Sequence, residues 1–106
     1  MTTTEYGTWY NFTGHNTTVE ADVATFVAAY DDEWRNRLVI SGRFSEIVKA
    51  YREAINDALP EGVYLAGNVI YGPVRDANKY SRQDIAEIID SVDLAAIVEK
   101  YDPDND

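Results

Sequence analysis

The chain of 106 residues contains no cysteine and a single histidine. The lack of cysteine excludes disulfides and thiolate metal ligands and fits a reducing compartment. No apolar run approaches the roughly 18 residues that a membrane span needs. The first residues also lack the basic segment and apolar run of a secretory signal. We therefore expect one cytoplasmic domain, long enough to bury a core of its own.

Basic residues are absent from the first third of the chain. Residues 1–34 hold six acids and no base, residues 35–82 hold eight bases and five acids, and residues 83–106 hold eight acids and one base. The formal net charge is −10. This excess argues against direct binding to nucleic acid or to an anionic membrane, because phosphates would repel it. It favours a protein partner with a basic surface, or self-association in which the basic middle of one copy meets the acidic ends of another.

Catalytic motifs are absent as well. The sequence has no phosphate loop, dinucleotide fingerprint, Gly-x-Ser-x-Gly or His-Glu-x-x-His pattern. We expect no metal site, no cofactor and no enzymatic activity. His15 lies in an expected loop, and no motif supplies the oriented partner that a general base needs. A deep pocket lined by His15 and two carboxylates would instead favour an enzyme.

The first half of the chain predicts a strand and two helices. Aromatic and β-branched residues indicate a strand over 6–13, with Trp9 and Asn11 facing one way and Tyr10 and Phe12 the other. A capping-box pattern at Thr17 and Glu20 precedes an apolar stripe, which predicts a helix over 18–36. A second stripe runs from residue 44 to residue 59, where Pro60 ends it.

The second half predicts a β-hairpin and two more helices. Residues 63–71 indicate either a hairpin that turns at Gly67-Asn68 or one strand with a bulge at Gly67. Ser81 and Asp84 form a second capping box, and a slip in the helical phase near residue 92 predicts helices over 82–90 and 93–101. This order is typical of an α+β fold: a single small domain in which three to four helices pack on a small antiparallel sheet or hairpin. We assign the domain to residues 1–101 and a disordered acidic tail to residues 102–106.

Two groups of residues are candidates for binding a partner. Asp84, Glu87 and Asp90 recur at i, i+3 and i+6, so they form an acidic ridge on the expected helix, with no base between them. A solvated helix face is the ordinary explanation of such a ridge. Tyr64 and Tyr71 on the expected hairpin are of a type enriched in interface hot spots.

The run Asp31-Asp32-Glu33 is harder to explain from the sequence. It would lie near the C-terminal end of the expected first helix, where acids interact unfavourably with the helix dipole. A basic neighbour would offset this, and Arg35 and Arg37 are the local candidates.

Three segments carry a resemblance to known proteins: Trp9-Tyr10-Asn11, residues 59–63 running into residues 71–73, and residues 93–103. Together they resemble small acidic proteins of unknown function from actinobacteria and their phages or plasmids. The resemblance implies a bacterial or phage protein without enzymatic activity, and it assigns no functional residue. Our leading hypothesis is a non-catalytic protein-interaction module. The alternative is a nucleic-acid mimic that inhibits restriction or another defence system.

Overall fold

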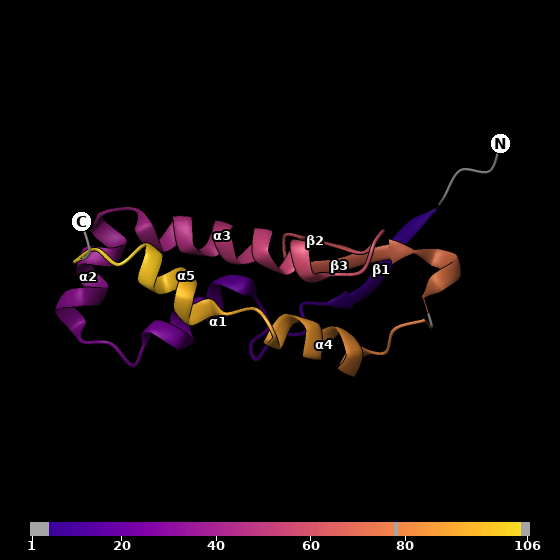
Figure 1. The fold of residues 1–106 in the computed structure, drawn as a ribbon, viewed down its shortest axis with the longest axis horizontal. Helices are drawn as coiled ribbons and strands as arrows, with labels where there is room; N and C mark the ends of the chain where they lie inside the picture. Colours follow the sequence, from indigo (N-terminus) through magenta and orange to yellow (C-terminus); the bar gives the residue numbers. More distant parts are fainter. Residues whose placement is uncertain (1–4, 78, 105–106) are drawn as a thin grey trace.

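The computed structural model describes residues 5–77 and 79–104 and is elongated, with extents of 54 × 26 × 18 Å. Figure 1 shows the sheet toward one end and a long helix, α3, along one side. In chain order the elements are β1 (Tyr6–Asn11), α1 (Val19–Val27), α2 (Asp32–Ile40), α3 (Arg43–Ala58), β2 (Tyr64–Ala66), β3 (Val69–Pro73), a 3₁₀ turn (Val74–Asp76), α4 (Arg82–Asp90) and α5 (Leu94–Lys100). The predicted α+β class, with helices packed on a small antiparallel sheet, is confirmed.

The sheet has the strand order β1-β3-β2, and both pairings are antiparallel. The hairpin interpretation of residues 63–71 is confirmed, because β2 and β3 pair across Gly67-Asn68. Gly67 has a φ of 60°, a conformation that glycine adopts without steric cost. In β1 the strict alternation predicted from the sequence is interrupted. Thr8 lies opposite Tyr71 and Tyr10 lies opposite Ile70, so Trp9 is the extra residue of a bulge.

The single helix predicted over 18–36 is wrong, because the structure divides it into α1 and α2. Asp31 has extended backbone angles, and its carboxylate accepts a hydrogen bond of 2.8 Å from the backbone N–H of Trp34. This N-cap starts a second helix at a point where the apolar spacing continues. The cap of α1 is also displaced by one residue, since Thr18 rather than Thr17 accepts the N–H of Ala21.

The division into α1 and α2 changes the position of the Asp31-Asp32-Glu33 run from the end of a helix to its start. Asp31 is the N-cap of α2, and Asp32 and Glu33 occupy its first turn. Acids at a helix N-terminus interact favourably with the helix dipole, typically by 0.3–1 kcal/mol each. The expected placement at a helix C-terminus was therefore wrong, whereas the expected basic neighbour is present, since Arg35 pairs with Asp32.

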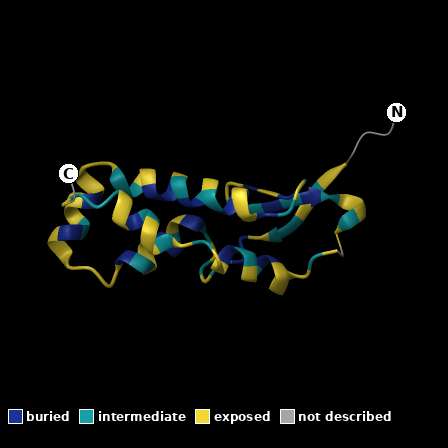
Figure 2. Cartoon of the chain, viewed as in Figure 1, coloured by how far each residue is buried: buried dark blue, intermediate teal, exposed yellow. Residues whose placement is uncertain are grey.

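The core forms around α3. This helix packs against α1, α2, α4, α5 and β2, and Figure 2 shows its inner side buried and its outer side exposed. Ile47, Tyr51 and Ile55 lie on the buried side, as the predicted stripe requires. The end of α3 before Pro60 also agrees with the sequence.

The carboxyl-terminal part follows the predicted helices closely. The helices α4 and α5 lie within the predicted ranges of 82–90 and 93–101, and the Ser81–Asp84 capping box is present. The start of the expected tail is held in place: Asp102 accepts a hydrogen bond of 2.9 Å from the indole Nε1–H of Trp34, and Asp104 accepts two from Arg37. Residues 105–106 lie outside the described residues.

Candidate functional site

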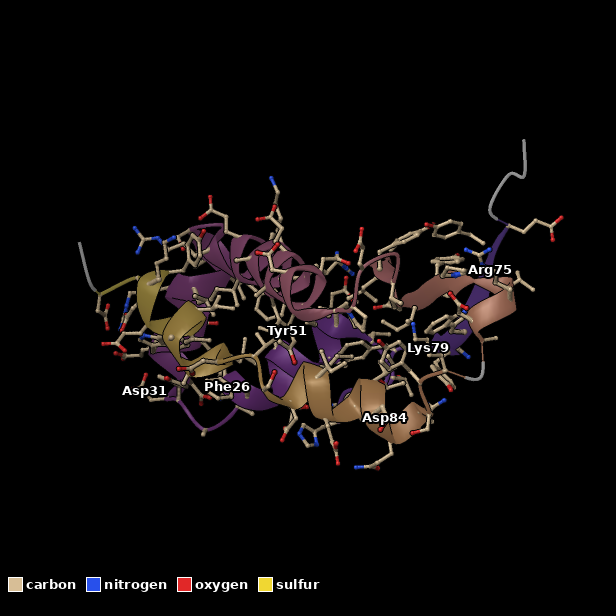
Figure 3. The ribbon with its side chains drawn as sticks, turned by 45° about the vertical axis from the view of Figure 1, so that its right-hand side comes forward. Phe26, Asp31, Tyr51, Arg75, Lys79 and Asp84 are labelled. Carbon is tan, nitrogen blue, oxygen red and sulfur yellow. The ribbon has the colours of Figure 1, made fainter. Side chains whose placement is uncertain are left out.

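A cleft of about 920 Å³ lies between the loop after β1 and the helices α1, α4 and α5. Tyr51 of α3 reaches it from the opposite side. Figure 3 shows this side chain between α3 and the helices α1 and α4. The apolar part of the lining is formed by Phe26, Ile89, Val92 and Leu94 together with alanines of α4 and α5. No strand contributes to the lining.

The charged side chains of the cleft are mostly of one sign. Its lining contains four carboxylates and His15, with no lysine or arginine. The carboxylates are Asp22 of α1, Glu87 and Asp90 of α4, and Asp93 between α4 and α5. In the described part of the chain, no group of three or more His, Asp and Glu side chains is placed to hold a metal ion. The arrangement therefore offers a spread of negative charge around an apolar surface, which suits an extended organic cation.

Asp22 forms the inner end of the cleft and is only 6% exposed. One carboxylate oxygen accepts a hydrogen bond of 3.0 Å from the amide of Asn16, and the other accepts one of 3.1 Å from the hydroxyl of Tyr51. Burial, and then the neighbouring Asp22 charge, raise the pKa of the Tyr51 hydroxyl above its usual value, so Tyr51 stays protonated as a donor.

Gly14 allows the loop to approach this carboxylate. A Cβ atom at position 14 would lie 2.5 Å from the Asp22 oxygen Oδ2 and 2.5 Å from the ring of Phe12. Real side chains do not approach so closely, so glycine is required for this packing. The loop that breaks the first strand is thus also a wall of the cleft.

The outer rim carries His15 and Asp90. The His15 Nε2 atom lies 3.1 Å from an Asp90 carboxylate oxygen, and the two side chains are 80% and 71% exposed. Contacts between such exposed groups contribute little to stability, typically less than about 1 kcal/mol. Their effect is to place an imidazole beside a carboxylate at the entrance. The cleft as a whole is lined by His15 and more than two carboxylates, which is the arrangement that we expected to favour an enzyme.

The structure separates the three members of the acidic ridge. Asp84 belongs to the capping box: its carboxylate accepts the Ser81 N–H at 2.9 Å, and the Ser81 hydroxyl accepts the Asp84 N–H at 3.1 Å. Asp84 does not line the cleft, whereas Glu87 and Asp90 do. All three side chains are exposed. The three acids therefore share the exposed face of α4, as the sequence predicts, and two of them, Glu87 and Asp90, also belong to the acidic cleft.

The two tyrosines proposed from the sequence lie elsewhere. Tyr64 and Tyr71 stack on the sheet with ring centroids 5.4 Å apart, and Tyr6 lies 5.8 Å from Tyr64. None of these three rings lines the cleft. Acidic and aromatic candidates thus occupy two separate surfaces.

Three arginines of the basic middle form ion pairs within the chain. Arg52 contacts Glu20 at 2.6 Å, Arg37 contacts Asp104 at 2.8 Å, and Arg35 pairs with Asp32 one turn earlier. The Arg52 hydrogen bond holds the pKa of the Glu20 carboxyl below its usual value. These three arginines of the basic middle therefore contact acids within the chain, and they do not form a basic patch separate from the acidic ends.

Sequence reasoning missed Asp22 and Thr13 as site residues. A signal for Asp22 was available: residues 22 and 26 are one helical turn apart, so this acid lies beside Phe26 at the edge of the apolar stripe. No comparable signal marks Thr13, which is buried in the loop after β1.

No family model matches the chain, and neither a curated protein nor a solved structure matches it. The site therefore has to be interpreted from its own geometry. In the described ranges 5–77 and 79–104, no helix is both long enough and apolar enough to span a bilayer.

Proposed function

We propose that the protein is a non-catalytic interaction module that binds a basic partner, and that a cationic group of this partner enters the cleft between α1, α4 and α5. The observation that carries the proposal is the composition of the lining: four carboxylates, an apolar surface and no lysine or arginine. Complementary charge at such a surface accelerates association and selects the partner's sign of charge.

The internal ion pairs support a separate partner rather than a second copy of the chain. Arg35, Arg37 and Arg52 already contact acids of their own chain. A second copy would have to break these contacts to offer these three arginines to the cleft, which leaves exposed bases such as Arg75 and Lys79 for self-association. A partner with its own unpaired lysines or arginines has no such cost.

The test is a binding titration with oligolysine, oligoarginine and oligoglutamate peptides, followed by calorimetry or fluorescence. We expect the basic peptides to bind and the acidic one not to bind. Binding should weaken strongly as the salt concentration rises to about 0.5 M, where screening shortens to a few ångströms. Affinity that is unchanged by salt would refute the electrostatic part of the proposal.

A charge-reversal pair locates the binding surface. The double variant Glu87→Lys/Asp90→Lys changes two exposed residues of the rim. Exposed pairs contribute about 0.2–1 kcal/mol each, so losing two of them should weaken the binding of a basic peptide about 2- to 30-fold. The matched control is Glu53→Lys/Asp57→Lys on the exposed side of α3, which changes the net charge equally. Equal weakening by both variants would show that net charge alone governs binding.

The nucleic-acid-mimic alternative predicts a narrower class of partner. Its support is the 54 Å length of the molecule and the exposed acids of α4, which would lie in the groove of a nucleic-acid-binding protein. Arg82, at the first position of the same helix, would be unfavourable in such a groove. Competition with duplex DNA separates the two hypotheses. If the protein mimics nucleic acid, its partner should release it when duplex DNA is added, whereas a partner that binds no DNA should keep it bound.

An enzyme is the remaining candidate because His15 and Asp90 meet at the rim of the cleft. An Asp–His contact can orient an imidazole as a general base. Hydroxyls of Thr25, Tyr51 and Ser91 also line the cleft. Turnover of generic ester or phosphoester substrates that disappears in His15→Ala would favour this candidate over a binding module.

A further inference from the structure

The inner end of the cleft contains a buried carboxylate with no cation beside it. Asp22 is 6% exposed, and its two hydrogen-bond donors, Asn16 and Tyr51, are both neutral. Among the residues that the structure describes, no lysine or arginine lines the cleft. Buried carboxylates in proteins are ordinarily paired with a cation or coordinate a metal. Within the described part of the chain, Asp22 is thus stabilised by neutral hydrogen-bond donors and by its place in the first turn of α1, and no cation of the lining pairs with it.

A second polar group at the same place lacks any partner. Thr13 lines the cleft and is 7% exposed, and its hydroxyl oxygen makes no hydrogen bond to any described residue. Most buried side-chain polar atoms in folded proteins have at least one partner. This hydroxyl is independent of the acidic residues, and it belongs to a residue that lines the same cleft as Asp22.

We propose that this inner end binds a primary alkylammonium group, with Asp22 and Thr13 as acceptors and the alkyl chain lying along Phe26 and Ile89. The proposal rests on the proposed function, because it names the cationic group that enters the same cleft. An ammonium donates up to three hydrogen bonds from one compact centre. The Thr13 hydroxyl would accept one of these bonds, since a threonine side chain can rotate about χ1 between staggered positions.

A guanidinium fits this place less well. Arginine recognises a carboxylate through two parallel hydrogen bonds, one to each oxygen. Each oxygen of Asp22 already accepts one bond, from Asn16 and from Tyr51 respectively. The lone pairs that remain suit a small point charge better than a planar fork. The inner end should therefore distinguish lysine-type amines from arginine.

The same ammonium can come from two sources, a lysine side chain of a partner protein or a free alkylamine. Titrations of the full chain with Nα-acetyl-lysine amide, Nα-acetyl-arginine amide and 1-aminopentane, which all carry one positive charge, separate them when followed by NMR shifts of the Asn16 side-chain amide. We expect both primary amines to bind at least about fivefold more tightly than the arginine derivative, the difference of one hydrogen bond. Tighter binding of the lysine derivative than of 1-aminopentane indicates a protein partner, and the reverse order indicates a free amine.

Two nearly isosteric variants test the acceptors. Asp22→Asn removes the charge and still allows hydrogen bonds to Asn16 and to the Tyr51 oxygen, and Thr13→Val removes the hydroxyl. Each should weaken amine binding about fivefold or more. Thr8→Val, at an exposed position of β1 outside the lining, is the control and should leave amine binding unchanged. Circular dichroism establishes that each variant is folded.

The outcomes separate this proposal from the proposed function. Basic peptides could bind without preferring lysine to arginine, and with an affinity that Asp22→Asn and Thr13→Val leave unchanged. This result would overturn the ammonium subsite and leave the acidic rim as the binding surface. Failure of every basic peptide and amine to bind would overturn both. Selective binding of primary amines that both variants weaken supports the subsite.

Discussion

Replacing Thr13 by valine should make the protein more stable. The Thr13 hydroxyl is buried, and no described residue satisfies it. Leaving a buried hydroxyl without a partner costs about 1–3 kcal/mol, and valine puts a methyl group of similar shape in its place. We expect the free energy of unfolding to rise by about 1–3 kcal/mol. Each kcal/mol corresponds to roughly 4–8 °C in melting temperature for a domain of this size.

The assay is urea and thermal unfolding of three variants beside the parent protein. Thr13→Ser keeps the hydroxyl and removes the methyl group, so it should lower stability by about 0.5–1.5 kcal/mol, as other single-methyl deletions do. Thr25→Val changes an exposed threonine whose hydroxyl accepts a hydrogen bond of 3.2 Å from Asn16. It should change stability by no more than about 0.5 kcal/mol.

A loss of 1 kcal/mol or more in Thr13→Val would refute this reasoning. Such a loss would mean that the hydroxyl has a partner in solution, and it would remove the second observation behind the ammonium subsite. A gain in stability together with weaker amine binding would instead show that the chain keeps an unsatisfied group for its ligand. Functional sites commonly trade stability for activity in this way.

Three further predictions concern the surroundings of the cleft and the end of the chain. Gly14→Ala should destabilise the protein by about 1–3 kcal/mol, because its Cβ would meet Asp22; an unchanged urea midpoint would show that the loop shifts freely. The pKa of Tyr51 is raised above the ordinary value of 10.0, so stability should fall as the pH rises above 10. The fall should be shallower in Tyr51→Phe, and identical pH profiles would contradict the buried hydroxyl. Asp102→Ala should lower the free energy of unfolding by about 1–3 kcal/mol, because it leaves the buried indole N–H of Trp34 without its acceptor. Urea unfolding followed by tryptophan fluorescence measures this change, and no loss of stability would mean that residues 102–104 do not stabilise α2.

Local signals in the sequence were sufficient for most of the elements. The capping box at Ser81, the phase slip before α5 and the Gly67-Asn68 turn each depend on residues within about four positions of one another, and each is present in the structure. The failure at the first helix is also local. Asp31 can act either as a helix residue or as an N-cap, and an apolar spacing that continues through it does not distinguish the two.

The site was predicted only in part. Glu87 and Asp90 were identified because the helical spacing of α4 places them on one face. Asp84 shares that face and serves as a cap. Tyr64 and Tyr71 were chosen by residue type, and the fold puts them on the sheet, outside the lining of the cleft. Residue type and spacing therefore indicate which side chains share an element, and they do not indicate which elements face one another.

The sequence by itself determined the α+β class, the helices from α3 onward and the acidic excess, because caps and apolar stripes act over a few residues. It left a hairpin and one bulged strand as alternatives for residues 63–71, and strand pairing decided between them. Tertiary structure alone decided that His15 meets Asp90, 75 positions away, and that Arg37 meets Asp104, 67 positions away. It also decided that Asp22 and Thr13 are buried at the inner end of an acidic cleft. These outcomes depend on how the apolar stripes of α1, α4 and α5 pack around α3, and that packing joins residues that no local pattern relates.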